Sequence, residues 1–182
     1  AALAALLLNK APVVVTGTGA GLCNEGLQRK IGAIEKAIAV NKPNPADPID
    51  MLAKVGGLDI AGMVGLYIGG AAAGVTILID GVISAVAAVL AAQIAPGCKD
   101  YMLASHLSKE PAGELLLQEL GLRPLVKAEM CLGEGTGAIA CMSLIDIAGN
   151  VYEKMCTFAD ANIEKYEKQD EKQLLLNKKK TG

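Results

Sequence analysis

Residues 75–81 are VTILIDG, an uncharged run rich in β-branched side chains that ends in an aspartate and a glycine. Such a run predicts a buried strand, and the alanine-rich residues that follow it, to about residue 95, predict a helix. Residues 100–106 and 111–120 repeat this order of strand and helix. The alternation predicts an α/β fold, with a doubly wound, mainly parallel sheet that has helices on both faces.

Upstream of this stretch, residues 12–16 (PVVVT) predict a further buried strand, which ends in the glycine-rich loop GTGAG at 17–21. Apolar residues at helical spacing predict a helix over 25–40, and Asn24 is the residue we expect to cap it. A second glycine-spaced helix is predicted over residues 59–72. These elements extend the same fold toward the N-terminus.

A rigid connector with Pro43, Pro45 and Pro48 follows the helix predicted over 25–40, and Asp47 is well placed to begin the next helix, which holds Met51, Leu52 and Val55. Downstream, a further helix is predicted after residue 137. We therefore expect an α/β domain over residues 1–150, followed over residues 151–182 by a C-terminal helix and a charged tail that is largely solvated.

Composition and charge exclude several classes of protein. The 182 residues carry a net charge of −2, which offers no concentrated basic face for a nucleic acid. The five cysteines are odd in number and widely spaced, and they form neither a C-x-x-C pair nor a zinc-ligand pattern. We expect reduced thiols, a cytoplasmic location and no metal site.

Two uncharged runs, residues 61–79 and 81–98, are each about as long as a membrane-spanning helix, so a membrane hairpin is an alternative. Asp80 would lie in the tight turn between them, and no aromatic belt marks their ends. We therefore expect no membrane insertion. The chain begins AALAALLL, without Met or a basic segment, which fits a helix entered midway better than a signal peptide.

Polar and glycine-rich residues follow the predicted strands at 17–21, 80–81, 105–109 and 133–137. Because ligands bind at the carboxyl ends of parallel strands, these four loops predict one crevice. The loop at 17–21 is suited to contact a phosphate or ribose, and a plain tight turn is the alternative.

Glu134 lies between Gly133 and Gly135, with Leu132 and Ile139 nearby. We expect its carboxylate to lie in a dry pocket, where desolvation raises the pKa of Glu134 toward that of a useful base. A solvated loop glutamate is the alternative.

His106 is the single histidine and follows a predicted strand. It has no Ser or Cys nucleophile motif around it, so a structural role is favoured over a catalytic one.

Five collinear motifs resemble the nicotinate-nucleotide:dimethylbenzimidazole phosphoribosyltransferase family. They are GTGAGLCNEGLQRK (17–30), DPIDMLAKVGGLDIAG (47–62), IDGVIS (79–84), YMLASHLSKEP (101–111) and LGEGTGA (132–138). The resemblance implies transfer of phosphoribose from nicotinate mononucleotide to 5,6-dimethylbenzimidazole, giving α-ribazole 5′-phosphate and nicotinate for the lower loop of cobalamin.

The resemblance also implies roles for individual residues. Glu134 would be the base, and the other substrate-binding residues would be Lys30 and Ser108 toward the phosphate, Gly19 in the loop at 17–21, Asp80 and Gly81 toward the ribose, and Gly133, Gly135 and Thr136 in the loop that aims Glu134. The leaving pyridine is already a cation, so no general acid, metal or other cofactor is needed.

The chain departs from the family at Ala20, where threonine is more frequent, and at Cys23, where aspartate is common. Family members are nearly twice as long, and their N-terminal half supplies much of the base pocket. We therefore expect a homodimer or association with the missing half. The alternative is a non-catalytic module that binds α-ribazole or a ribotide phosphate. A dinucleotide oxidoreductase is disfavoured, because the third glycine of the loop at 17–21 comes one residue early.

Overall fold

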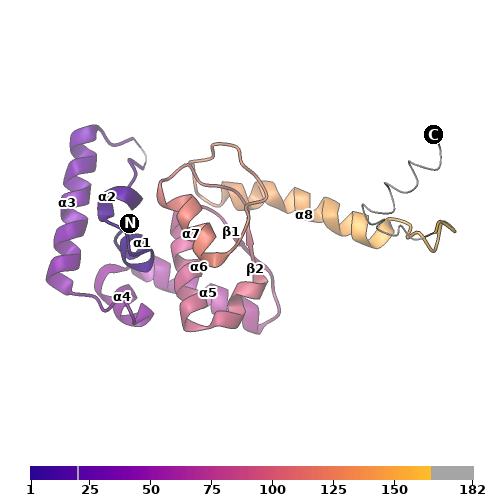
Figure 1. The fold of residues 1–182 in the computed structure, drawn as a ribbon, viewed down its shortest axis with the longest axis horizontal. Helices are drawn as coiled ribbons and strands as arrows, with labels where there is room; N and C mark the ends of the chain where they lie inside the picture. The colour runs from indigo at the N-terminus through magenta and orange to yellow at the C-terminus, as the bar shows by residue number, and fades with distance from the viewer. Residues whose placement is uncertain (20, 165–182) are drawn as a thin grey trace, which may run out of the picture. The chain divides into compact units, whose positions relative to one another are not determined.

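The computed structural model describes residues 1–19 and 21–164. The chain divides into two compact units, residues 1–144 and 145–182. The elements in chain order are α1 (Ala2–Leu7), α2 (Pro12–Val15), α3 (Asn24–Asn41), α4 (Pro48–Val55), α5 (Leu58–Ala72), β1 (Ile77–Ile79), α6 (Val82–Ile94), the 3₁₀ helix η1 (Pro96–Tyr101), β2 (Met102–Ala104), α7 (Ala112–Leu120) and α8 (Thr136–Lys154) (Figure 1).

Strands β1 and β2 are parallel, with Ile77, Leu78 and Ile79 opposite Met102, Leu103 and Ala104. Helix α6 is the crossover between them, as a parallel pair requires. A parallel bridge between His106 and Val126 carries the pairing one segment further. The predicted α/β class with parallel strands is therefore confirmed.

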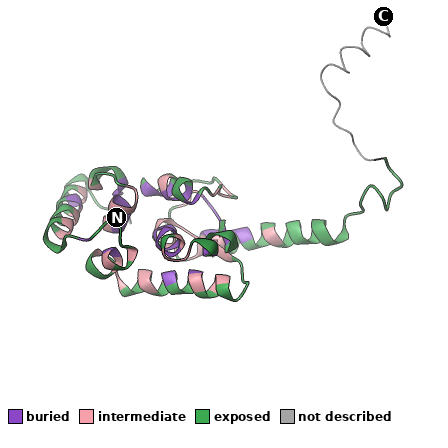
Figure 2. Cartoon of the chain, turned by 60° about the horizontal axis from the view of Figure 1, so that its bottom comes forward, coloured by how far each residue is buried: buried purple, intermediate pink, exposed green. Residues whose placement is uncertain are grey.

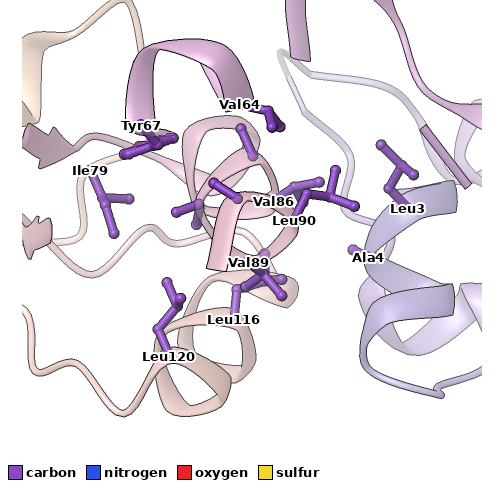
Figure 3. Packing of buried hydrophobic residues seen from close by; sticks show 14 of the residues in the cluster. Leu3, Ala4, Val64, Tyr67, Ile79, Val86, Val89, Leu90, Leu116 and Leu120 are labelled. Carbon is purple, nitrogen blue, oxygen red and sulfur yellow. The ribbon is translucent and has the colours of Figure 1, made fainter. Parts of the chain in front are cut away.

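Helix α6 is the centre of the core. Its residues from Ala85 to Ala91 are all buried, and the helix packs against both α5 and α7. Figure 3 shows Val86, Val89 and Leu90 of α6 among side chains of the neighbouring helices, which are Leu3 and Ala4 of α1, Val64 and Tyr67 of α5, and Leu116 and Leu120 of α7. This packing fixes the loop that joins β1 to α6, where Asp80 and Gly81 lie.

Most predicted helices are present. The helices predicted over 25–40, 59–72 and 111–120 are α3, α5 and α7. Asp47 begins α4 as predicted, because its carboxylate accepts N–H bonds from Ile49 and Asp50 at 3.0 and 3.1 Å. The prediction that Asn24 caps α3 is wrong, since Asn24 is already the first helical residue and the preceding Cys23 makes no side-chain cap bond.

The prediction of a buried strand over residues 12–16 is also wrong. Residues Pro12–Val15 form the short helix α2, and Val13 and Val14 are exposed. Proline at the first helical position has a φ suited to the helix and no N–H to satisfy, and the Thr16 hydroxyl donates to the Pro12 carbonyl at 2.6 Å. These local contacts outweigh the strand preference of the valines.

The two uncharged runs are occupied by α5 and by α6 with η1. Within residues 1–19 and 21–164, no helix has both the length and the hydropathy that crossing a membrane would need. In the second unit, residues 146–164 are all exposed (Figure 2). Most of the predicted charged tail, residues 165–182, lies outside the described residues.

Candidate functional site

Asp80 lies at the carboxyl end of β1 and connects this strand to the start of α8. Its Oδ1 accepts the backbone N–H of Gly137 at 2.9 Å and of Ala138 at 3.1 Å, and its Oδ2 accepts that of Gly135 at 3.3 Å. The first N–H groups of a helix have no partner within the helix, and a carboxylate both pairs them and interacts favourably with the helix dipole. Asp80 therefore caps α8 from 55 residues or more away in the sequence.

The turn that follows Asp80 is also held in place. The Ser84 hydroxyl donates to the Gly81 carbonyl at 2.9 Å, and the buried Tyr67 lies near Ser84. Burial raises the pKa of Tyr67 above its ordinary value of 10.0. Tyr67 is therefore a neutral, buried group beside the turn that follows Asp80.

Glu134 occupies the middle of a left-handed turn. Gly133, Glu134 and Gly135 have φ values of 76°, 57° and 76°, a region that glycine adopts freely and that costs other residues free energy. The Thr136 hydroxyl donates to the Gly133 carbonyl at 2.7 Å and closes the turn. Glu134, at the middle of this turn, is exposed.

His106 lies under the first turn of α8. Its ring is 3% exposed, and its Nδ1 lies 3.0 Å from the Ser105 hydroxyl and 4.0 Å from Asp80 Oδ1. The Ser105 hydroxyl donates to the Ile79 carbonyl at 2.6 Å, so Nδ1 carries the proton of the bond to Ser105. A β-carbon on Gly137 would overlap the ring, so α8 packs directly on it. The structural role predicted for His106 is consistent with these contacts.

The predicted phosphate-binding residues lie around Gly17. Lys30 Nζ donates to the Gly17 carbonyl at 2.9 Å, and Gly19 lies near the same ammonium group. Gly17 also packs against Glu110 and Pro111, immediately before α7. The Glu110 N–H donates to the Ser108 hydroxyl at 3.3 Å. Lys30, Gly19 and Ser108 are therefore brought into one neighbourhood.

The loops at 80–81, 105–109 and 133–137 lie together in space, but the cavity described for this chain lies elsewhere. Asp80 contacts the loop at 133–137, His106 lies under it, and Lys109 donates its N–H to the Met130 carbonyl at 3.1 Å. A cavity of about 340 Å³ lies instead beside α7 and is lined by Leu107, Glu114, Leu117, Gln118, Leu122, Arg123, Pro124 and Lys127. Only Leu107 belongs to the four predicted loops.

Comparison with known proteins agrees with this arrangement. The family model described as "Phosphoribosyltransferase" matches residues 1–163. The chain belongs to this phosphoribosyltransferase family.

Members of this family share much of the sequence of the chain. It is 47% identical over 165 residues to the nicotinate-nucleotide–dimethylbenzimidazole phosphoribosyltransferase of Ruminiclostridium cellulolyticum, covering 91% of the chain and 47% of that relative. The enzyme of that name from Escherichia coli strain SMS-3-5 is 43% identical over 163 residues, covering 90% of the chain and 45% of that relative. The chain thus spans about half the length of these relatives.

The fold is also that of solved members of the family. CobT from Thermus thermophilus superposes with a TM-score of 0.83 at 39% identity, over 91% of this chain and 49% of that one. A second structure, of the phosphoribosyltransferase from the same organism, gives 0.81 at 38% identity over 91% of this chain and 48% of that one. These likenesses confirm the predicted α/β fold class.

The environment predicted for Glu134 is not found in this chain. Leu132 and Ile139, taken as signs of a dry pocket, are 75% and 66% exposed, and Glu134 is exposed as well. The prediction of a desolvated carboxylate is therefore wrong for the described residues. A β-carbon would meet no atom within 4 Å at Gly81 or Gly133, so both glycines border open space.

Three residues around the start of α8, Gly137, Ser105 and Cys141, were not predicted from the sequence. The absence of a β-carbon at Gly137 leaves room for the His106 ring. The Ser105 hydroxyl hydrogen-bonds to that ring and to the last residue of β1, and the Cys141 thiol donates to the Ser105 carbonyl at 3.0 Å. Gly137 and Ser105 lie within the quoted motifs, which was the available signal. No local pattern indicates Cys141, because its partner lies 36 residues away.

Proposed function

We propose that the protein transfers the phosphoribosyl group of nicotinate mononucleotide to 5,6-dimethylbenzimidazole, giving α-ribazole 5′-phosphate and nicotinate in cobalamin lower-ligand synthesis. The observation that carries this proposal is the left-handed turn that presents Glu134 beside the carboxyl end of β1. The names of the relatives support it, since each is named for this pair of substrates.

In this reaction a benzimidazole nitrogen attacks the anomeric carbon of the ribose from the face opposite the pyridinium. The new carbon–nitrogen bond forms as the bond to the pyridinium nitrogen breaks. The electron pair of the broken bond leaves with nicotinate, whose ring nitrogen becomes uncharged. Glu134 accepts the proton from the other benzimidazole nitrogen, as positive charge develops on that ring. The exposed position of Glu134 in this chain leaves it accessible to such a ligand.

The phosphate of the nucleotide is assigned to the neighbourhood of Gly17. Lys30 supplies a cation and Ser108 a hydroxyl, which together suit a phosphomonoester, and Gly19 allows close approach of the backbone. Gly81 is assigned to the ribose side, where the family resemblance also implies Asp80, with Gly133, Gly135 and Thr136 shaping the loop. The contact of Lys30 with the Gly17 carbonyl at 2.9 Å supports this placement.

The partner is expected to be either a second copy of the chain or the N-terminal half that the relatives have. Glu134, Leu132 and Ile139 are all exposed, which supports a base pocket completed by further protein. A cytoplasmic location is supported by the five free thiols.

The test is the formation of α-ribazole phosphate from the two substrates, by this chain alone and with the separately expressed N-terminal half of a relative. Glu134→Gln should lower turnover by about 10²–10⁴-fold, the usual contribution of a general base, with nucleotide binding retained. Unchanged turnover in this variant would exclude Glu134 as the base.

Glu129→Gln is the matched control. Glu129 is also an exposed glutamate in a left-handed conformation, with a φ of 53°, and its carboxylate pairs with Lys109 at 3.1 Å on the surface. This variant should keep full turnover. If the chain binds α-ribazole phosphate without turnover, both alone and with the added N-terminal half, a non-catalytic ribotide-binding module is favoured instead. Inhibition of turnover by a metal chelator would contradict the metal-free mechanism.

A further inference from the structure

The hydrogen bonds of Asp80 leave its carboxylate little capacity for a ligand. An ionised carboxylate offers about four acceptor positions, and backbone N–H groups of Gly135, Gly137 and Ala138 take three of them. The Asp80 side chain is only 17% exposed, with the His106 ring 4.0 Å away. Asp80 is thus directed at protein backbone.

The turn that carries Glu134 depends on contacts from outside itself. Three successive residues have positive φ, and the middle one is a glutamate, which does not prefer this conformation. A conformation of this kind persists where the surrounding structure imposes it. The bond from Gly135 N–H to Asp80 attaches the residue next to Glu134 to the end of β1, and the bonds from Gly137 and Ala138 attach the helix that follows.

We propose that Asp80 is a positioning residue, which directs the Glu134 carboxylate by capping the N-terminus of α8. This inference rests on the proposed function for the role of Glu134 and differs from it in what Asp80 does. A ribose contact would act on binding of the nucleotide. A positioning residue acts on the geometry of the base, so its loss lowers kcat and leaves KM nearly unchanged.

The test compares Asp80→Asn and Asp80→Ala with the unsubstituted chain. Asparagine keeps one carbonyl oxygen for Gly137 and Ala138 but places an NH₂ group opposite the Gly135 N–H, which then loses its acceptor. Alanine removes all three bonds. Hydrogen exchange of these three backbone amides is measured together with kcat and with KM for nicotinate mononucleotide.

Asp47→Ala provides the matched control. Asp47 caps α4 with two comparable bonds to Ile49 and Asp50, so its loss reproduces the removal of a helix cap away from Glu134. This variant should be destabilised and keep its kcat. The comparison separates an effect on the base from a general loss of stability.

We expect faster exchange of the Gly135 amide in Asp80→Asn and of all three amides in Asp80→Ala. In both variants kcat should fall about 10²-fold, as for a misplaced catalytic group, with KM within about twofold. A raised KM with unchanged kcat would overturn the proposal in favour of the ribose contact. Faster exchange of these amides with unchanged kcat and unchanged KM would also overturn the proposal.

Failure of the proposed function has a different signature. Full turnover in Glu134→Gln would remove the base assignment, and with it the reason to position that residue. If the unsubstituted chain shows no turnover with or without the added half, the proposed reaction fails. Hydrogen exchange of the backbone amides then tests the capping of α8 by itself. A Gly135 amide that stays protected in Asp80→Ala would overturn the capping role.

Discussion

The imidazole of His106 occupies the space where a side chain on residue 137 would begin. Helix α8 can therefore start on the histidine ring only because Gly137 lacks a β-carbon. The same ring lies 3.0 Å from the Ser105 hydroxyl, and this hydroxyl donates to the last residue of β1. A single glycine thus allows the helix, the histidine and the strand to meet.

Gly137→Ala should lower the free energy of unfolding by about 1–3 kcal/mol, the usual cost of adding a methyl group to a packed site. The new β-carbon would displace His106 or the first turn of α8. Urea denaturation of the full chain measures the change. The control is Gly149→Ala on the same helix, where a β-carbon meets nothing within 4 Å, and which should raise stability by up to about 1 kcal/mol. Equal effects of the two substitutions would contradict the contact.

Glu134→Gly should stabilise the chain while abolishing turnover. Glycine adopts the φ of 57° found at residue 134 without the cost borne by glutamate, which amounts to about 1–2 kcal/mol. Lys42→Gly is the matched variant, because Lys42 ends α3 at a φ of 45° and has no part in the proposed site. It should gain similar stability and keep its activity. A loss of stability in Glu134→Gly would show that the glutamate side chain itself supports the turn.

The five cysteines should fall into two classes of reactivity. Cys98 and Cys141 are buried, and burial raises the pKa of both thiols, so neither forms the reactive thiolate readily. The other three, Cys23, Cys131 and Cys156, are exposed. Alkylation of the native chain, followed by peptide mapping, should label these three first. Rapid labelling of Cys141 would contradict its bond to the Ser105 carbonyl.

Stability in acid should depend on Asp50. The Lys54 ammonium, 2.9 Å away, and the backbone N–H of Asn44 hold the pKa of Asp50 below its ordinary value of 3.8. A folded-state pKa below the unfolded value stabilises the folded chain above pH 3.8 and loses that effect as the pH falls through the folded pKa. Asp50→Asn should therefore flatten this part of the pH dependence, measured by thermal unfolding at a series of pH values. An unchanged acid profile would exclude the contribution.

Much of the fold is predictable because its signals are local. Asp47 caps the helix that follows it directly, and the run that ends in Asp80 forms β1. The strand predicted over residues 12–16 was wrong because two local signals conflict there. The valines favour a strand, while Pro12 and Thr16 stabilise a helical turn. Local patterns compete at this site, and the side-chain hydrogen bond decides the outcome.

The candidate site is less predictable because its contacts join distant residues. The motifs identified Glu134 and Asp80 separately, but the bonds from Asp80 to the helix span 55 to 58 residues. Leu132 and Ile139 suggested a dry pocket by their apolar character, yet burial depends on what packs against a residue. In this chain both remain exposed.

The length of chain between Asp80 and α8 has a consequence for the order of folding. Contacts between residues far apart in sequence form slowly, because a long loop must close before they yield any gain. Helix α6, strand β2 and helix α7 lie within that loop, and β1 ends where it begins, so we expect these elements to assemble before Asp80 accepts its three backbone bonds. The turn that presents Glu134 is therefore expected to mature last, so a partly folded chain would have its strands paired before it could have a working base.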